Sequence, residues 1–343
     1  MKINEVLKYA RTLNQHTQLY DILKHRLINK GYIRSDKQKE DLNDLVLSEL
    51  HLIANNSYQG FEAQKLHLLF QATYYLNSGN YKSAIRYYQE LINLFNDNQH
   101  LILNPPIYYL SAIQGILDSL CIAGLYHETP FFLSKLEDEY STEFILHLKT
   151  LIYIYKSNSL LQAGNFEQAL ELRDKQENEL LKKVTSLGLE SQLRLYLSFA
   201  VLGMYTKDYV QARKYMKKIF SLGKLFCAFP SYKIARLVNL LLQAELGNYD
   251  FFKNEIISIK RNIRFEKQTY ITEKLIFKFI QGYPLPSYEK ARNKRWLQYQ
   301  KDIQKIEQDK YERQLLKTFD VLAWIESKLT QRSLADIFAE KAH

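Results

Sequence analysis

The sequence contains few glycines and prolines, and this scarcity excludes several fold classes. Its 343 residues include 11 glycines and 6 prolines, whereas average usage would give about 24 and about 17. Strand-rich folds need a turn roughly every 8–12 residues, so most all-β architectures are excluded, as are collagen-like and proline-rich chains. The same scarcity disfavours the glycine-rich loops of nucleotide-binding enzymes. Because 46% of the residues are hydrophobic, the composition excludes a disordered chain as well.

Cysteines and long apolar runs are also scarce. Cys121 and Cys227 are the only two cysteines and lie 106 residues apart, so we expect neither a zinc site nor a disulfide framework. The longest strongly apolar stretch, residues 195–205, is shorter than the roughly 18 residues that a membrane-spanning helix needs. Residues 1–13 lack the continuous apolar segment of a signal peptide. We therefore expect a cytoplasmic protein with no membrane partner.

The sequence lacks the motifs of common catalytic sites. Its eight histidines are scattered, and no nucleotide-binding, serine-hydrolase or zinc-protease motif is present. The acidic run at residues 137–139 lacks the spaced ligands of a metal site. We therefore predict that the protein is not an enzyme, holds no metal or cofactor, and has no small-molecule substrate.

A short block recurs five times and predicts a series of helical hairpins. Equivalent positions fall at 79, 124, 164, 207 and 247, with spacings of 45, 40, 43 and 40 residues. A glycine in the left-handed conformation ends one helix, and an asparagine or aspartate caps the next. A following aromatic residue is expected to be buried between the two helices, and an alanine lets them approach closely. The predicted structural residues are Gly79, Tyr81, Ala84, Gly164, Phe166, Ala169, Tyr209, Ala212, Gly247 and Tyr249.

The residues around these turns match a known repeat family. In the first copy Leu68, Ala72 and Tyr75 precede the turn, and Tyr88 and Leu91 follow it. This pattern resembles the tetratricopeptide repeat (TPR), in a bacterial type with longer than usual repeats, over about residues 61–265. The family's closing proline is absent, and the spacings exceed its 34 residues. The resemblance implies an all-α fold, a right-handed α-solenoid of stacked helical hairpins with extra helices at both ends. It also implies a non-catalytic protein–protein interaction scaffold or adaptor.

The flanking segments divide the chain into three predicted regions. Ser35 with Gln38, and Ser333 with Asp336, match the pattern of a helix-capping box. A break at residues 283–286, which contain two prolines, precedes a long helix that Ser287 is expected to cap. We predict N-terminal helices over residues 1–60, a TPR-like array over 61–282, and long C-terminal helices over 283–343 that pack on the array or project from it. The expected total is fourteen to seventeen helices.

The TPR resemblance also implies a concave groove lined by the first helix of each hairpin, where a protein or peptide would bind. The sequence is compatible with two alternatives. The groove holds an extended peptide or amphipathic helix from a partner, or the chain's own helices, at 267–280 or at the C-terminus, cover it because an exposed apolar groove promotes aggregation. The predicted groove residues are Thr73, Asn77, Gln114, Asp118, Asn158, Gln162, Arg194, Tyr205 and Glu245.

Positive charge is concentrated in one part of the chain. The net charge is +10, yet residues 201–300 alone contain 19 basic and 7 acidic residues. This asymmetry predicts an anion-binding or nucleic-acid-binding face; the alternative is a solvated helix surface without a ligand. A peptide-responsive regulator is a further alternative, although residues 1–55 show no helix-turn-helix signature. The predicted basic patch consists of Arg213, Lys214, Lys217, Lys218, Lys260, Arg261 and Arg264.

Overall fold

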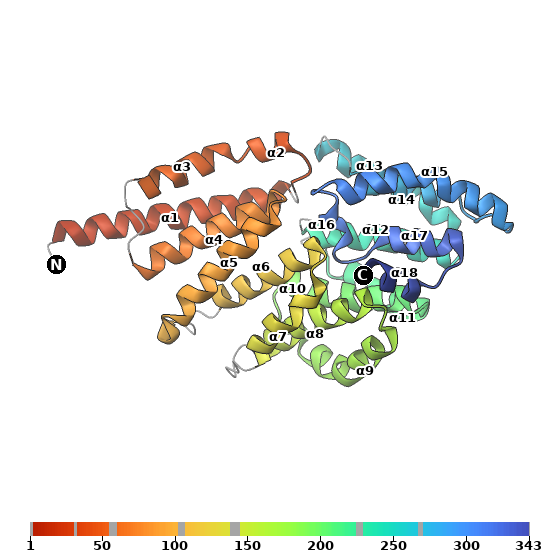
Figure 1. Ribbon diagram of the computed structural model, residues 1–343, viewed down its shortest axis with the longest axis horizontal. Helices are drawn as coiled ribbons and strands as arrows, with labels where there is room; N and C mark the ends of the chain where they lie inside the picture. Colours follow the sequence, from red (N-terminus) through yellow and green to blue (C-terminus); the bar gives the residue numbers. More distant parts are fainter. Residues whose placement is uncertain are drawn as a thin grey trace. The chain divides into compact units, whose positions relative to one another are not determined.

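The computed structural model describes residues 3–30, 33–54, 60–101, 107–137, 145–223, 229–266 and 270–342. Within these ranges the chain forms eighteen α-helices, three short 3-10 helices and no strand (Figure 1). The all-α prediction is therefore confirmed, and the helix count slightly exceeds the expected range. The chain divides into two compact units, Met1–Leu125 (unit 1) and Tyr126–His343 (unit 2). This boundary falls inside the predicted array, at the turn of its second copy.

Unit 1 is built around one helical hairpin and the helix that follows it. Its helices are α1 (Ile3–Lys30), α2 (Asp36–Glu40), α3 (Asn43–Ala54), α4 (Phe61–Asn77), α5 (Tyr81–Asn96) and α6 (Ile107–Ala123), with a 3-10 turn at Gln99–Leu101. Helices α4 and α5 pack as the predicted hairpin, α6 packs on both, and α1 packs on α4 and α3. The core between them includes Leu23, Phe70, Leu91 and Ile116, all of which are almost completely buried.

Unit 2 contains the remaining hairpins and the C-terminal helices. Its first helices are α7 (Thr129–Glu137), α8 (Ile145–Gln162), α9 (Phe166–Lys182), α10 (Leu189–Tyr205), α11 (Tyr209–Ser221), α12 (Pro230–Glu245) and α13 (Tyr249–Glu266), with 3-10 turns at Tyr126–Glu128 and Val184–Ser186. The C-terminal helices are α14 (Ile271–Ile280), α15 (Glu289–Gln308), α16 (Arg313–Leu316), α17 (Val321–Thr330) and α18 (Leu334–Ala342).

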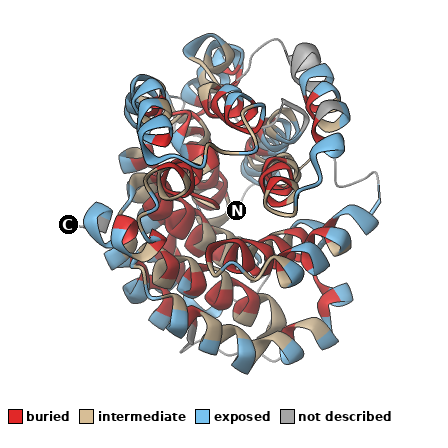
Figure 2. Ribbon diagram, turned by 90° about the vertical axis from the view of Figure 1, so that its right-hand side faces the viewer, coloured by how far each residue is buried: buried red, intermediate tan, exposed pale blue. Residues whose placement is uncertain are grey.

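The hairpins of unit 2 stack through their first helices. Helix α10 packs on α8 and on α12, while α9, α11 and α13 each pack against the first helix of their own hairpin. The C-terminal helices form a second group, in which α14 packs on α12, α15 on α14 and α17, and α18 on α17 and α8. On the surface helices, buried residues follow one side and exposed residues the other (Figure 2), as expected for amphipathic helices. Helix α10 is buried along almost its whole length.

The predicted hairpin turns are confirmed by their backbone conformation. Gly79, Gly124, Gly164 and Gly247 have φ values of 77°, 78°, 75° and 73°, which lie in the left-handed region that favours glycine. The looser copy has Lys207 at the equivalent position with φ 63°, so the turn geometry is kept where the sequence has lost the glycine. Asn80 and Asp208 then cap the second helices by accepting the backbone N–H groups of Ser83 and Gln211, whereas the predicted cap is wrong at Asn165, whose side chain makes no capping hydrogen bond.

The prediction that the turn aromatics are buried is only partly correct. Ala84, Ala169 and Ala212 are fully buried and Tyr81 is 7% exposed, whereas Phe166 and Tyr209 are half-buried. The prediction is wrong for Tyr249, which is 45% exposed. The buried position in this hairpin is taken one turn further along by Phe252, whose ring meets Tyr249 edge to face at 5.8 Å.

The helix caps predicted outside the array are confirmed at two of three places. The Oγ atoms of Ser35 and Ser333 accept the backbone N–H groups of Gln38 and Asp336 at 3.3 Å and 3.1 Å. Ser287 does not cap α15, because that helix begins after Tyr288. Instead, the carbonyl oxygen of Ser287 accepts a hydrogen bond from the guanidinium of Arg292 at 2.5 Å.

Two turn glycines form a matched pair for a stability experiment. Gly164 and Gly247 have nearly the same φ, but a Cβ on Gly164 would lie 2.9 Å from the carbonyl oxygen of Ala335, whereas a Cβ on Gly247 would meet nothing within 4 Å. We expect Gly247→Ala to destabilise the protein by about 1 kcal/mol, the cost of a left-handed alanine. We expect Gly164→Ala to cost about 1–3 kcal/mol more, because α18 must shift. Urea unfolding of both variants gives the comparison, and equal losses would contradict the close approach of Ala335.

Candidate functional site

In unit 2 the predicted groove positions face the chain's own C-terminal segment. The Nδ2 atom of Asn158 donates to the carbonyl oxygen of Lys317 at 3.2 Å, and the hydroxyl of Tyr205 accepts the backbone N–H of Asp320 at 2.7 Å. The Tyr205 ring also stacks on Phe319, with centroids 4.9 Å apart, and meets Phe338 edge to face at 5.3 Å. These contacts correspond to the alternative in which the chain's own helices cover the groove. Tyr205 is 3% exposed and is therefore not available to a partner.

Glu245 is the centre of a polar cluster between α12 and the C-terminal segment. Its Oε2 atom accepts hydrogen bonds from the Tyr209 hydroxyl and from Lys328 Nζ, both at 2.6 Å, and its Oε1 atom accepts one from the Tyr283 hydroxyl at 3.0 Å. Burial and the adjacent carboxylate raise the pKa of Tyr209 and of Tyr283 far above that of a free tyrosine. Both phenols therefore stay protonated, and the cluster fixes α17 against α12 rather than presenting a reactive group.

The other two groove residues of unit 2 are also turned towards neighbours or are half-exposed. Arg194 donates to the Tyr155 hydroxyl at 2.7 Å and lies over the same ring, 5.4 Å from its centroid. Gln162 lies half-exposed at the end of α8. The residues predicted to bind a peptide thus mostly form contacts between helices within unit 2.

In unit 1 the predicted groove residues lie on α4 and α6. Thr73 and Asn77 are half-exposed on α4, and the Asn77 side chain donates to the Thr73 carbonyl oxygen at 2.9 Å. Helix α1 packs on α4, and Tyr20 of α1 is hydrogen-bonded to the Thr73 side chain; burial nevertheless raises the pKa of Tyr20 to about 12. On α6, Gln114 is half-exposed and Asp118 is 8% exposed. The first copy is therefore partly covered by α1.

A buried carboxylate between two histidines was not predicted from the sequence. Glu49 of α3 is fully buried; its Oε1 atom lies 2.6 Å from Nδ1 of His67 on α4, and its Oε2 atom lies 3.5 Å from Nδ1 of His16 on α1. Burial opposes the charged form of Glu49, but the two histidines outweigh it, so the pKa of Glu49 is lowered. In the sequence, the indication that Glu49 is buried was its position on the same side of the helix as the apolar residues Leu45 and Leu52.

The basic residues of α11 differ in how free their charges are. Arg213 and Lys217 are exposed, and no described residue forms an ion pair with either. Lys214 pairs with Glu177 at 3.4 Å, and Lys218 lies over the rings of Tyr196 and Tyr215. On this helix, therefore, only Arg213 and Lys217, which are four residues apart, have neither a carboxylate nor an aromatic ring as a partner among the described residues.

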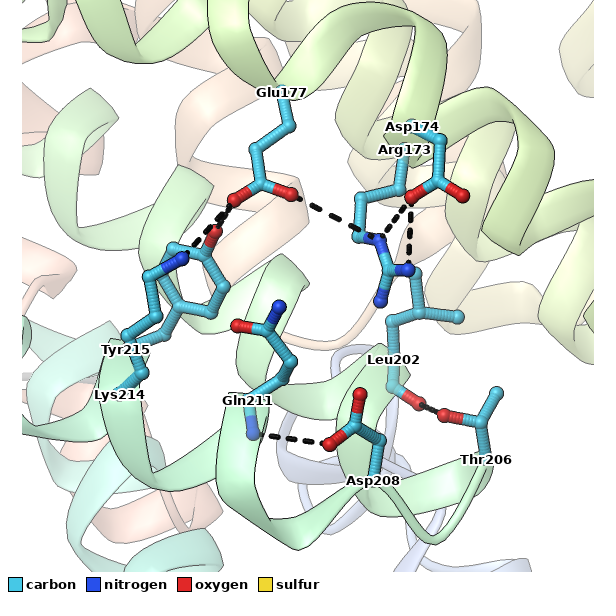
Figure 3. Close-up of polar contacts among 9 residues, drawn as sticks. All are labelled: Arg173, Asp174, Glu177, Leu202, Thr206, Asp208, Gln211, Lys214 and Tyr215. Atoms are coloured by element: carbon cyan, nitrogen blue, oxygen red, sulfur yellow. Dashed lines mark hydrogen bonds and ion pairs between the residues drawn. The ribbon is translucent and has the colours of Figure 1, made fainter.

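Glu177 of α9 neutralises part of the α11 patch. It receives hydrogen bonds from the Tyr215 hydroxyl and from Lys214 (Figure 3). Arg173, one turn earlier on α9, lies 3.9 Å from the same carboxylate and 2.8 Å from the carboxylate of Asp174. The arrangement ties α9 to α11 through hydrogen bonds to Oε1 of Glu177, and its Oε2 atom forms an ion pair with Arg173.

The basic residues of α13 form a second exposed group. Lys260 and Arg261 are exposed, and the Lys260 ammonium lies 5.5 Å from the centroid of the Phe277 ring. The side chain of Arg264 lies outside the described residues. Helices α11 and α13 each pack on α12, so the prediction that their basic residues merge into one stripe stays a prediction.

The comparisons with known proteins give no relative. No family model matches the chain, and no match was found among curated proteins or among solved structures. In the part of the chain that the structure describes, no helix combines the length and apolar character needed to cross a membrane. Nor does any group of three or more histidine, cysteine, aspartate or glutamate side chains in those ranges have a geometry that could hold a metal ion.

Proposed function

We propose that this chain is a non-catalytic interaction scaffold of right-handed, TPR-like hairpins. We propose further that it binds an anionic macromolecule on the exposed basic residues of α11 and α13, the second helices of two hairpins in unit 2. The observation that carries the proposal is the pair Arg213 and Lys217, which are exposed on α11 and have no carboxylate partner among the described residues. They lie in the segment that contains the whole positive excess of the chain. A field of one sign attracts partners of the opposite sign.

The internal use of the groove residues favours this outer surface over the concave one. Asn158, Tyr205 and Glu245 bond to Lys317, Asp320 and Lys328. A peptide entering this groove would have to displace α17 and α18 and leave buried polar groups without partners, which is costly. A ligand that contacts the exposed residues Arg213 and Lys217 of α11, by contrast, leaves no buried polar group without a partner.

The polar clusters support a non-catalytic role. The carboxylates of Glu177, Glu245 and Glu312 accept hydrogen bonds from this chain's own side chains or backbone, and Glu49 is enclosed by two histidines. A general acid or base needs an open position within hydrogen-bond reach of a substrate. Each of these groups instead joins two or more helices.

The proposal predicts salt-sensitive binding that depends on the α11 pair. We expect the protein to bind a labelled random-sequence oligonucleotide or poly-glutamate in 50 mM salt, and to lose most of that binding at about 200 mM, because exposed charges are screened and counterions are released. The variant R213E/K217E should bind at least about 10-fold more weakly, since each phosphate contact contributes to the affinity. Fluorescence anisotropy at the two salt concentrations gives the measurement.

Two control variants separate this local effect from a change in net charge. K8E/K82E alters exposed lysines of unit 1 by the same total charge and should bind both probes nearly as the wild type does. R213K/K217R keeps the positive charges and should also retain binding. If neither polyanion binds at 50 mM salt, or if K8E/K82E weakens binding as much as R213E/K217E, the proposed function is wrong.

A further inference from the structure

Helix α15 presents a straight row of lysines to solvent. Lys290, Lys294, Lys301 and Lys305 are all exposed, and at about 100° per residue they fall within an arc of about 60° on the helix surface. The opposite side of the helix carries the buried residues Tyr299, Ile303 and Ile306, where α15 packs on α14 and α17. The row therefore lies on the side of the helix that points away from the core.

The positive charges of this row are not neutralised by the described residues. None of the four lysines forms an ion pair there, and Asp302, which is adjacent to Lys301 in the sequence, pairs instead with Lys278 of α14 at 3.7 Å. Lys290 with Lys294, and Lys301 with Lys305, are like-charged i,i+4 neighbours, a spacing that destabilises an isolated helix. This arrangement opposes helix formation and gives the lysines no internal contact. It therefore indicates that an external anion is their partner.

The residues beside the row favour contact with a phosphate backbone. Exposed amide side chains flank it, at Asn293, Gln298, Gln304 and Gln308, and such groups donate hydrogen bonds to phosphate oxygens. The centre of the row is Leu297, which is 64% exposed, and the row contains no aromatic ring. Proteins that hold single strands stack bases on aromatic side chains, so the row lacks the feature that a single strand would require.

We infer that the lysine row of α15 binds the backbone of double-stranded nucleic acid without reading its sequence. With a rise of about 1.5 Å per residue, the row from Lys290 to Lys305 is about 22 Å long. A duplex carries one negative charge per about 1.7 Å of its axis when both strands are counted, so a row of this length lies along a stretch of duplex that contains about thirteen phosphates. This inference rests on the proposed function and names the class of its anionic partner.

The salt dependence of binding to a random-sequence duplex tests the inference. Four phosphate contacts should contribute about −3.6 to the slope of the logarithm of the binding constant against the logarithm of salt concentration, which is about a 150-fold loss between 50 and 200 mM. We expect the variant K290Q/K294Q/K301Q/K305Q to lose that part of the slope. Glutamine keeps the helix propensity close to that of lysine, and circular dichroism confirms that the variant is folded. The matched variant with four arginines should keep the wild-type slope.

The outcomes separate this inference from the proposed function. If the four-glutamine variant keeps the wild-type slope while R213E/K217E loses binding, the α15 row is not the contact and the scaffold proposal stands. Binding to poly-glutamate that exceeds binding to the duplex would also overturn the inference, because the partner would then be an acidic protein segment. Tighter binding to a single strand than to the duplex of the same length overturns the choice of a duplex. No binding of either polyanion at 50 mM salt overturns both proposals.

Discussion

Replacing Tyr205 with alanine should lower the free energy of unfolding of unit 2 by about 3–5 kcal/mol, the usual cost of removing a buried aromatic ring. The ring is in contact with Phe166, Phe319 and Phe338, so its loss leaves a cavity where α10 meets α9 and the C-terminal segment. Trp296 and Trp324 are the only tryptophans of the chain, and both lie in unit 2. Urea unfolding followed by tryptophan fluorescence therefore reports on the unit that carries the substitution.

A second variant at the same position separates the ring from its hydroxyl. Tyr205→Phe keeps the ring but leaves the backbone N–H of Asp320, which donates to that hydroxyl at 2.7 Å, without an acceptor in a buried site. Such a loss costs about 1–3 kcal/mol, so Tyr205→Phe should lie between the wild type and Tyr205→Ala. Equal stabilities of all three proteins would show that the C-terminal segment does not pack on α10 as described.

The hairpin turns were predictable because each depends on residues close together in the sequence. A glycine that ends one helix and a side chain that caps the next act within about four residues, and these interactions do not require knowledge of the rest of the fold. The left-handed φ at Gly79, Gly164 and Gly247 follows from that local pattern. The same conformation at Lys207 shows that the stacking of α10 on α11 imposes the turn even where the residue does not favour it.

For the interior of unit 2, the sequence left two alternatives for what covers the inner layer of helices. The pattern of α8, α10 and α12 indicated an apolar inner layer, but whether a partner or the chain itself covers that layer depends on contacts more than a hundred residues apart, such as that between Tyr205 and Asp320. Tyr249 was wrongly expected to be buried, because the sequence pattern cannot distinguish it from Phe252 as the residue that enters the core. The unpaired state of the α15 lysines likewise depends on where distant carboxylates lie.

The second large expected effect on stability is that of replacing the buried Glu49 in unit 1. We expect Glu49→Gln to lower the free energy of unfolding of unit 1 by about 3 kcal/mol or more, because removing the charge of one member of a buried ionic cluster leaves its partners without compensation. Circular dichroism should show an earlier helical transition in urea, while tryptophan fluorescence, which follows unit 2, should not shift. The control Glu40→Gln removes an exposed carboxylate of the same unit and should change stability by less than about 0.5 kcal/mol.

The effect of Glu49→Gln should depend on pH in a direction set by the cluster. The pKa of Glu49 is lowered in the folded protein, since His16 and His67 outweigh the opposing effect of burial, and it therefore lies below the value of about 4.3 in the unfolded chain. A lowered pKa contributes stability that is fully present above the unfolded value and is lost as the pH falls through the folded value. The difference in stability between wild type and Glu49→Gln should thus be constant from about pH 5 to pH 6 and shrink below about pH 4. A difference that grows on acidification would mean that burial, rather than the two histidines, sets the pKa of this carboxylate.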